Sequence, residues 1–281
     1  MKQGGVLSPL LFTLFVDIVL DQLERSKLGC FVNYTCFNSL MYADDIVLLS
    51  ASVTDLQKMF DICADIFKIL DLPVNISKCH CMRIGPRHKY FCKPIIFFNN
   101  QIEWVDSVDY LGISICKSQI FKCSWYKSKC KFFRSANAIL GRLGSTTASD
   151  VVLKLVNSNS LPVLLYGTTA VSLTVSEMKD LGSAYDSLFS KVFRIYDKKS
   201  ILKCQYFFGC WPVRLIYEYN RFNYLNKLFK EEKLKPGVDI DQPDYTEYCN
   251  LITKYIFDIN DSINTIRFKI WCYFEKLVAE L

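Results

Sequence analysis

The spacing of apolar positions predicts helices and strands in the first part of the chain. Apolar residues recur at helical spacing between residues 11 and 23, directly after a Ser8-Pro9 pair that suits the start of a helix. Past Gly29 the period changes, and the short β-branched and aromatic runs that follow are typical of strands. These expected strands occupy residues 31–36, 40–42 and 46–49.

A second helical face follows, and further strands come after it. Thr54 and Gln57 have the spacing of a capping box at the start of this helix, and Leu72-Pro73 ends it. Asn99-Asn100 suits the turn of a hairpin. The remaining strands and the hairpin are expected at residues 79–84, 95–105 and 108–115. Residues 1–116 therefore predict an α+β layer, in which an antiparallel sheet carries helices on one face.

Beyond Ser118 the pattern is almost wholly helical. Thr174 and Glu177 form a second capping box, and Pro212 suits the first turn of another helix. The expected helical segments include residues 124–143, 148–155 and the region around Pro162, with one or two more in 244–281. We place a boundary near residues 116–122 and divide the chain into 1–116, 117–235 and 236–281.

The charge is uneven along the chain. The net charge is +6, but residues 113–235 carry 20 basic against 8 acidic side chains, and the flanking segments are mildly acidic. A basic block suits a polyanionic partner, and a solvated lysine-rich face is the alternative. Aromatic residues interleave with the lysines and Arg134 here, which fits either a nucleic-acid face or a helix core, and burial favours the core. These aromatic residues are Trp125, Tyr126, Phe132 and Phe133.

Cysteine usage and apolar segments bear on the compartment. The thirteen cysteines include no C-x-x-C pair and no zinc spacing, which favours small core residues in a reducing compartment. The apolar amino end resembles a short signal peptide but lacks a small-x-small cleavage site. Residues 155–176 carry no charge, yet they are too polar for a bilayer span. We expect an intracellular protein, in cytoplasm or nucleus, and rank a secreted or membrane protein last.

Two adjacent carboxylates, Asp44 and Asp45, lie between apolar runs where a tight turn is expected. Phosphoryl transfer onto a nucleotide chain needs two divalent cations held about 4 Å apart, and Mg²⁺ prefers hard oxygen ligands. A hairpin that fixes short carboxylates suits this chemistry. Taken alone, Tyr42-Ala43-Asp44-Asp45 fits an acidic exposed turn better than a metal site, so the surrounding motifs decide.

Those surrounding motifs resemble the ordered motifs of reverse transcriptases from non-LTR (LINE-like) retrotransposons. Residues 3–12, Gln3-Gly4-Gly5-Val6-Leu7-Ser8-Pro9-Leu10-Leu11-Phe12, resemble the B motif, and residues 42–46 resemble the C motif. Leu72, Asn75 and Lys78 look like the D motif, and Tyr110-Leu111-Gly112 looks like the E motif, called the primer grip. Residues 161–167 are similar to a segment of retroelement thumbs. The four motifs follow the family order over residues 3–112.

The resemblance implies an RNA-directed DNA polymerase with two-metal nucleotidyl transfer, and it implies residue roles. Asp44 would ligate catalytic Mg²⁺, with Asp45 as a secondary ligand. Lys78 would lie near the leaving pyrophosphate, although an ordinary solvated lysine fits it as well. The template and nascent base pair would meet Gln3, Gly4, Gly5, Tyr42 and Ala43. The primer end would be held by Tyr110, Leu111 and Gly112.

The resemblance also implies partners and a deficit. The partners would be an RNA template, an RNA–DNA or DNA primer duplex and a dNTP, with Mg²⁺ as cofactor, no small-molecule cofactor and no membrane. The fold would be a partial polymerase palm followed by a mainly α-helical thumb and C-terminal region. The family's fingers and A motif, which supplies another metal-binding Asp, would precede residue 3. We therefore expect a truncated copy that is inactive alone, and the alternative is a non-catalytic nucleic-acid-binding remnant.

Overall fold

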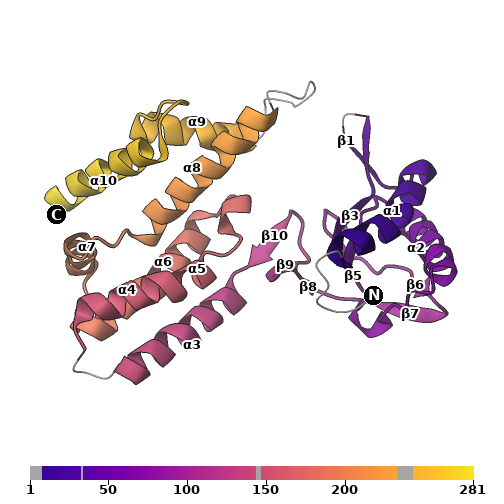
Figure 1. The fold of residues 1–281 in the computed structure, drawn as a ribbon, viewed down its shortest axis with the longest axis horizontal. Coiled ribbons are helices and arrows are strands. Elements are labelled where there is room, and N and C mark those ends of the chain that lie inside the picture. Colours follow the sequence, from indigo (N-terminus) through magenta and orange to yellow (C-terminus); the bar gives the residue numbers. More distant parts are fainter. Residues whose placement is uncertain (1–7, 33, 144–146, 233–242) are drawn as a thin grey trace. The chain divides into compact units, whose positions relative to one another are not determined.

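The computed structural model describes residues 8–32, 34–143, 147–232 and 243–281 of the 281-residue chain. The chain divides into two compact units, Met1–Cys123 and Ser124–Leu281 (Figure 1). The first unit mixes helices with small sheets and the second is helical, which confirms the mixed α+β class. None of the helices within these ranges is long and apolar enough to cross a membrane.

Two helices and one small sheet form the core of the first unit. Helix α1 (Ser8–Ser26) packs against α2 (Val53–Ile69), and α2 covers the sheet with strand order β5-β7-β6. That sheet contains β5 (His80–Cys81), β6 (Ile95–Phe97) and β7 (Asn100–Trp104). The buried core side chains are Val16, Val19, Leu23, Met59, Cys63, Ile66, Cys81, Ile95, Phe97 and Ile102. Helices α1 and α2 supply six of these ten side chains.

The other strands of the first unit form short hairpins instead of the single antiparallel sheet that we expected. Two-stranded sheets join β1 (Cys30–Val32) to β2 (Thr35–Phe37) and β3 (Ser39–Tyr42) to β4 (Asp45–Leu48). A three-stranded sheet has the order β10-β9-β8. Its strands are β8 (Ser107–Tyr110), β9 (Ile113–Cys116) and β10 (Lys122–Ser124). Moreover, β5 runs parallel to β7, so the described sheets are not purely antiparallel.

Positive backbone φ angles explain where the strand predictions fail. The single strands expected at 31–36 and 108–115 are hairpins, because Tyr34 and Leu111 adopt φ of 65° and 47° and reverse the chain. The turn expected at Asn99-Asn100 lies one residue earlier, since Phe98 and Asn99 have positive φ and Asn100 already pairs with Phe97. The strand expected at 79–84 is reduced to β5.

The capping box predicted at Thr54 and Gln57 is wrong. The N-cap of α2 is Ser52, whose hydroxyl accepts a hydrogen bond from the backbone N–H of Asp55 at 3.0 Å. Gln57 instead donates to the carbonyl of Ile96 at 2.7 Å and accepts from the N–H of Ile96 at 2.8 Å. Gln57 therefore pairs with β6 as a neighbouring strand would, and it fixes α2 against the sheet.

Helices make up nearly all of the second unit. In chain order they are α3 (Tyr126–Leu143), α4 (Ser149–Asn159), α5 (Leu161–Leu164), α6 (Val175–Phe193), α7 (Lys198–Phe207), α8 (Val213–Glu232), α9 (Pro243–Tyr255) and α10 (Ile263–Ala279). The capping box of Thr174 and Glu177 at the start of α6 is confirmed. Helix α8 lies between α6 on one side and the α9–α10 pair on the other (Figure 1). It buries Phe222 and Leu225 against Ile270 of α10.

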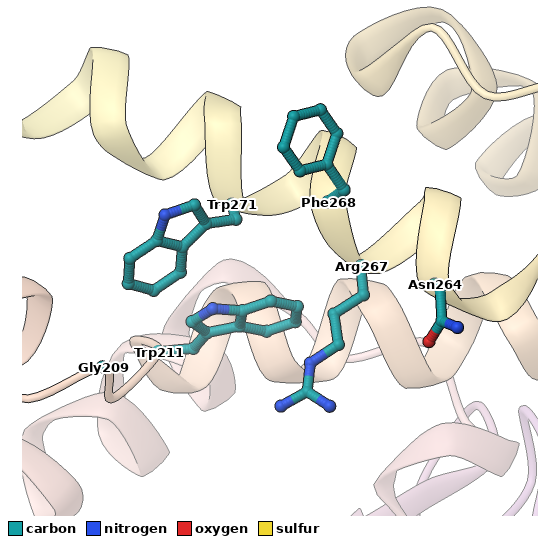
Figure 2. A pocket seen from close by; sticks show the side chains of 6 residues that line it. All are labelled: Gly209, Trp211, Asn264, Arg267, Phe268 and Trp271. Atoms are coloured by element: carbon teal, nitrogen blue, oxygen red, sulfur yellow. The ribbon is translucent and has the colours of Figure 1, made fainter.

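A glycine determines how the chain leaves α7. Gly209 has a φ of 66°, and its N–H donates to the carbonyl of Tyr206 while the N–H of Cys210 donates to that of Gln205. This is a Schellman motif, which requires the left-handed conformation that glycine adopts readily. The motif brings Trp211 opposite Trp271 of α10, and the two rings border a hollow (Figure 2).

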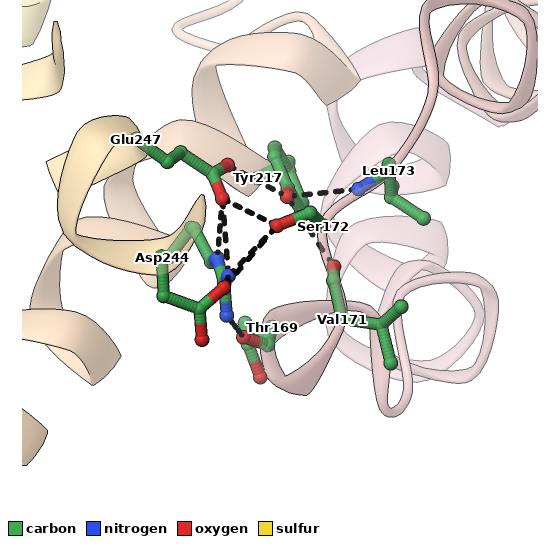
Figure 3. Close-up of polar contacts among 8 residues, drawn as sticks. Thr169, Val171, Ser172, Leu173, Tyr217, Asp244 and Glu247 are labelled. Carbon is green, nitrogen blue, oxygen red and sulfur yellow. Dashed lines mark hydrogen bonds and ion pairs between the residues drawn. The ribbon is translucent and has the colours of Figure 1, made fainter. Parts of the chain in front are cut away.

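A fully buried arginine ties three elements of the second unit together. The Arg221 guanidinium of α8 donates to Asp244 at 2.6 Å and to Glu247 at 3.0 Å, both on α9. It also donates to the carbonyl of Thr169 in the 3₁₀ helix η2 (Thr168–Ala170) at 2.8 Å and to the hydroxyl of Ser172 at 2.9 Å (Figure 3). The buried guanidinium is tolerated because its N–H groups donate hydrogen bonds to these acceptors on α9, in η2 and at Ser172.

A second buried charge, Glu218, lies one turn earlier on α8. Its carboxylate accepts hydrogen bonds from Lys254 at 2.5 Å, from Arg214 at 2.9 Å and from the hydroxyl of Tyr255. Burial alone would raise the pKa of Glu218, but the hydrogen bonds from Lys254 and Tyr255 outweigh it and hold that pKa below its usual value.

The lowered pKa of Glu218 predicts acid sensitivity. A carboxyl with a depressed pKa in the folded state contributes stability above its unfolded pKa, and the contribution disappears as pH falls through the folded pKa. Glu218→Gln should therefore lower the free energy of unfolding most at neutral pH, and the gap to the unmodified chain should narrow below about pH 4.3. Urea unfolding between pH 7 and pH 3 measures this. The exposed Glu280, directly after α10, provides the control: Glu280→Gln should leave the free energy of unfolding close to that of the unmodified chain at every pH.

The cysteines only partly follow the sequence prediction. The described cysteines form no disulfide. Five of them are buried, while most of the others are half-buried and Cys130 is exposed, so fewer belong to the core than we expected. Burial raises the pKa of the Cys63 and Cys81 thiols to about 12, which makes these two thiols unreactive.

Candidate active-site hairpin and nucleic-acid interface

The hairpin of β3 and β4 presents the two adjacent aspartates. Tyr42 pairs with Asp45, so Ala43 and Asp44 form a two-residue turn, and Ala43 adopts a φ of 52°. Met41, Ile46 and Leu48 pack against the core of the first unit. Because successive strand residues point to opposite faces, this packing leaves the other face of the hairpin exposed.

The aspartates and their neighbour are open to solvent. Ala43, Asp44 and Asp45 are all exposed, and the side chain of Tyr42 is 63% exposed. Nothing in the core requires carboxylates at this turn. The hairpin is held by its packing against the core, so the exposed carboxylates at its tip are suited to bind a ligand.

The structure brings the aspartate hairpin close to Tyr110, the first residue of the expected primer grip. Partial burial raises the pKa of the Tyr110 phenol, and the nearby Asp45 carboxylate raises this pKa further. These residues are far apart in sequence and belong to different sheets. A charge of the proposed C motif thus acts on a side chain of the proposed E motif.

Tyr110, Leu111 and Gly112 stand at a tight turn. Tyr110 pairs with Ile113, and the two turn residues have φ of 47° and 81°. Positive φ at both central positions is the requirement of the hairpin turns that match strand twist. The Ser114 hydroxyl donates to Asp109 at 2.5 Å across the strands, which helps to hold the register of the hairpin.

The other proposed site residues lie elsewhere or outside the described ranges. Lys78 is exposed at the end of the 3₁₀ helix η1 (Ile76–Lys78), and its N–H donates to the carbonyl of Asn75 at 3.1 Å. Among the described residues, no recorded contact joins Lys78 to Asp44 or Asp45. Gln3, Gly4 and Gly5 lie outside the described residues, so their proposed roles stay predictions.

The carboxylates are suitable but too few for a complete metal site. Asp44 and Asp45 offer the hard oxygens that Mg²⁺ prefers. Within the described ranges, however, no three His, Cys, Asp or Glu side chains gather into a group able to hold a metal ion. The described residues therefore supply at most part of a magnesium site.

Helix α3 separates its aromatic and basic residues. Phe132 and Ala136 are buried, and Trp125, just before the helix, is buried too, which agrees with the core interpretation. Phe133 is half-buried, but Tyr126 is 69% exposed, which contradicts the core interpretation for this residue. Lys131, Arg134 and Arg142 are exposed at helical spacing and form a basic stripe, which we name the α3 stripe.

The segment that resembles a thumb motif forms a short helix and a turn. Leu161 and Leu164 of α5 are buried, and Pro162 lies in the first turn. Gly167 adopts a φ of 75° before η2, while Tyr166 is 55% exposed. Thr169 and Ser172, directly after this segment, bond Arg221, so the segment leads into the buried network of α8.

Sequence reasoning missed the contacts that hold the site in place. Gln57 was assigned to a helix cap, whereas it joins α2 to β6. A polar side chain beside the apolar positions of a helical stripe was the available signal. The neighbourhood of Asp45 and Tyr110 had no signal of its own in the sequence, since only the order of the motifs implied it.

Comparison with known proteins agrees with the resemblance over the first part of the chain. The model of the family described as reverse transcriptase (RNA-dependent DNA polymerase) matches residues 1–115. The chain is also 31% identical over 132 residues to the retrovirus-related Pol polyprotein from the type-2 retrotransposable element R2DM of Drosophila melanogaster. That match covers 44% of this chain but only 12% of the polyprotein. Residues 1–115 of this chain are thus similar to the reverse transcriptase family.

Proposed function

We propose that this chain carries the metal-binding hairpin, the primer-gripping turn and the thumb of a retroelement RNA-directed DNA polymerase. The observation that carries the proposal is the exposed pair Asp44 and Asp45 at the tip of the β3–β4 hairpin, within the segment that matches the reverse transcriptase family. In such an enzyme Mg²⁺, when bound, stabilises the charge that develops on the transferred phosphoryl group. Asp44 would be its ligand here and Asp45 a secondary one.

The remaining roles follow the same proposal. Tyr110, Leu111 and Gly112 hold the primer end, and Lys78 lies near the leaving pyrophosphate. Residues 1–116 are the partial palm, 117–235 the thumb and 236–281 a C-terminal extension. The substrates are an RNA template, a primer duplex and a dNTP.

A second candidate function is nucleic-acid binding without catalysis by these 281 residues. Two observations favour it: the described residues lack a third metal ligand beside Asp44 and Asp45, and the α3 stripe is exposed. A basic stripe binds phosphates without reading sequence, so its affinity falls as salt rises. The stripe would grip the hybrid duplex in either case, whether or not nucleotides are added.

Primer extension separates the two functions. We expect the 281-residue chain to add no nucleotide to an RNA-templated primer in Mg²⁺, because a two-metal site with part of its carboxylates does not position both ions. Extension that is abolished by Asp44→Ala, but not by Asp17→Ala on the exposed face of α1, would instead establish the polymerase in these residues alone.

Salt-dependent binding tests the α3 stripe. We expect Lys131→Gln together with Arg134→Gln to weaken binding to an RNA–DNA hybrid. The slope of log affinity against log salt concentration should fall by the equivalent of about two phosphate contacts. Fluorescence anisotropy at several salt concentrations measures both quantities. The exposed Lys230→Gln and Lys276→Gln pair, which removes the same charge from α8 and α10, is the matched control. Equal losses in both double variants would remove the stripe from the proposal.

A further inference from the structure

The hollow between α10 and the segment after α7 has a chemical character that the proposed function does not use. Figure 2 shows Trp211 and Trp271 facing each other across it, with Arg267 beside Trp211. Its volume is about 330 Å³, within the range of about 300–1,000 Å³ that small-molecule sites occupy. Gly209, Asn264 and Phe268 complete the lining.

The two indole rings are held from behind by other aromatic rings. Tyr206 of α7 stacks on Trp271 with ring centroids 5.2 Å apart and planes 16° apart. Tyr219 of α8 meets Trp211 edge to face at 5.6 Å. Because these partners restrict ring motion, the hollow is bordered by a stiff aromatic platform.

The polar groups of the hollow favour an anionic ligand. The Arg267 guanidinium lies over the Trp211 ring, 5.8 Å from its centroid. Asn264 is exposed at the rim, and the six lining residues include no acid. The nearby acids of α10 and its amino end have other partners: Asp261 accepts from Lys269 at 2.6 Å, and Glu275 accepts from Tyr206 at 3.2 Å.

We propose that this hollow binds an unpaired base of single-stranded RNA. The base would stack on the tryptophan platform, the Asn264 amide would hydrogen-bond its edge, and Arg267 would contact the adjoining phosphate. The proposal rests on the proposed function, because an RNA-directed polymerase handles template that is not yet paired. Stacking requires a free base face, so a duplex does not fit this site.

A protein partner fits the lining less well. An apolar helix laid into the hollow would cover Arg267 and Asn264 without offering them acceptors, which is unfavourable for buried polar groups. RNA supplies the π-face, the edge acceptors and the phosphate together. Phe268, whose side chain is 66% exposed, extends the aromatic surface at the rim.

A neighbouring hollow gives the strand a continuation. A second hollow of about 410 Å³ shares Gly209 with the first and is lined by Phe208, Lys154 and Ser158, among other residues. Phe208 is 40% exposed. Asp150 of the same lining pairs with Lys154 at 3.5 Å, so the next nucleotide of the strand would meet the ring of Phe208 and the hydroxyl of Ser158 there.

The test compares two double variants of α10 in the full chain. Arg267→Gln with Phe268→Ala changes the hollow, and both side chains are exposed, so folding is retained. Lys276→Gln with Ile263→Ala is the matched control, since it removes the same charge and Ile263 is also 66% exposed. Anisotropy of a labelled oligouridine measures binding. We expect the first pair to weaken it about tenfold and the control pair to leave it unchanged.

The outcomes distinguish this site from the thumb surface. Oligouridine binding that is equal in the two double variants of α10 would overturn the proposal. An RNA–DNA hybrid is the second probe: the Arg267→Gln/Phe268→Ala variant should bind it normally, and the Lys131→Gln/Arg134→Gln variant should not. If the Lys131→Gln/Arg134→Gln variant binds the hybrid as tightly as the unmodified chain does, only the proposed function is contradicted. If the Arg267→Gln/Phe268→Ala variant loses as much affinity for the hybrid as for oligouridine, the single-strand site is contradicted.

Discussion

Arg221→Ala is expected to lower the free energy of unfolding of the second unit by about 3–5 kcal/mol. The side chain is 0% exposed, and it supplies the positive charge to Asp244 and Glu247. Removing it leaves two carboxylates facing each other and leaves the carbonyl of Thr169 without this donor. Removing one partner of a buried ion pair is more harmful than replacing the whole pair, because the remaining carboxylates lose their cation while they stay partly shielded from water.

Tryptophan fluorescence measures this loss directly. The chain has four tryptophans, and Trp125, Trp211 and Trp271 lie in the second unit, so the emission follows that unit during urea unfolding. The matched control is Lys230→Ala, which removes an exposed cation from the same helix and should change the stability by less than about 0.5 kcal/mol.

A triple variant separates the effect of the unpaired carboxylates on stability from the effect of the lost packing. Arg221→Met with Asp244→Asn and Glu247→Gln removes the charges on both sides while keeping most of the volume. We expect it to recover much of the stability that Arg221→Ala loses. An equal loss in the two variants would mean that the network acts through packing, and the electrostatic explanation would be wrong.

The sequence predicted what depends on local patterns. The helices α1, α2 and α3 and the capping box of α6 were recovered, because helical period and cap chemistry lie within a few residues. The Arg221 network could not be recovered. Its partners lie 23 to 52 residues away, and no local pattern marks them. An arginine in a basic block looks the same in sequence whether it is buried or solvated.

The strands failed for a different reason. Leu111 occupies positive φ at a turn, although apolar residues rarely adopt it, so the apolar pattern of 108–115 did not mark the reversal there. Phe98 also has positive φ, which moves the predicted turn at Asn99-Asn100 one residue earlier. The Asp44-Asp45 turn was located correctly between two runs because acidic residues interrupt apolar strands. Its function was not readable from the turn. Only the ordered motifs around it suggested one, and the roles of its residues stay predictions.

Support for that turn comes from the helices beneath it, and Leu23→Ala is expected to show how much. Leu23 of α1 is 0% exposed and belongs to the cluster that contains Met59 of α2 and contacts Met41 and Ile46 of the hairpin. Truncating a buried leucine loses its transfer free energy and leaves a cavity, together about 3–5 kcal/mol. We expect the first unit to be destabilised by this amount and the aspartate hairpin to lose its rigid base.

Leu14 of the same helix provides a control with identical chemistry. Its side chain is 62% exposed, so Leu14→Ala removes the same atoms without making a cavity and should change the stability by less than about 0.5 kcal/mol. Hydrogen exchange followed on peptides from α1, α2 and the hairpin reports the first unit alone. Faster exchange in all three segments for Leu23→Ala only would tie the hairpin to this core. Faster exchange confined to α1 would mean that the hairpin is held by its own strands, and the cluster would not be its support.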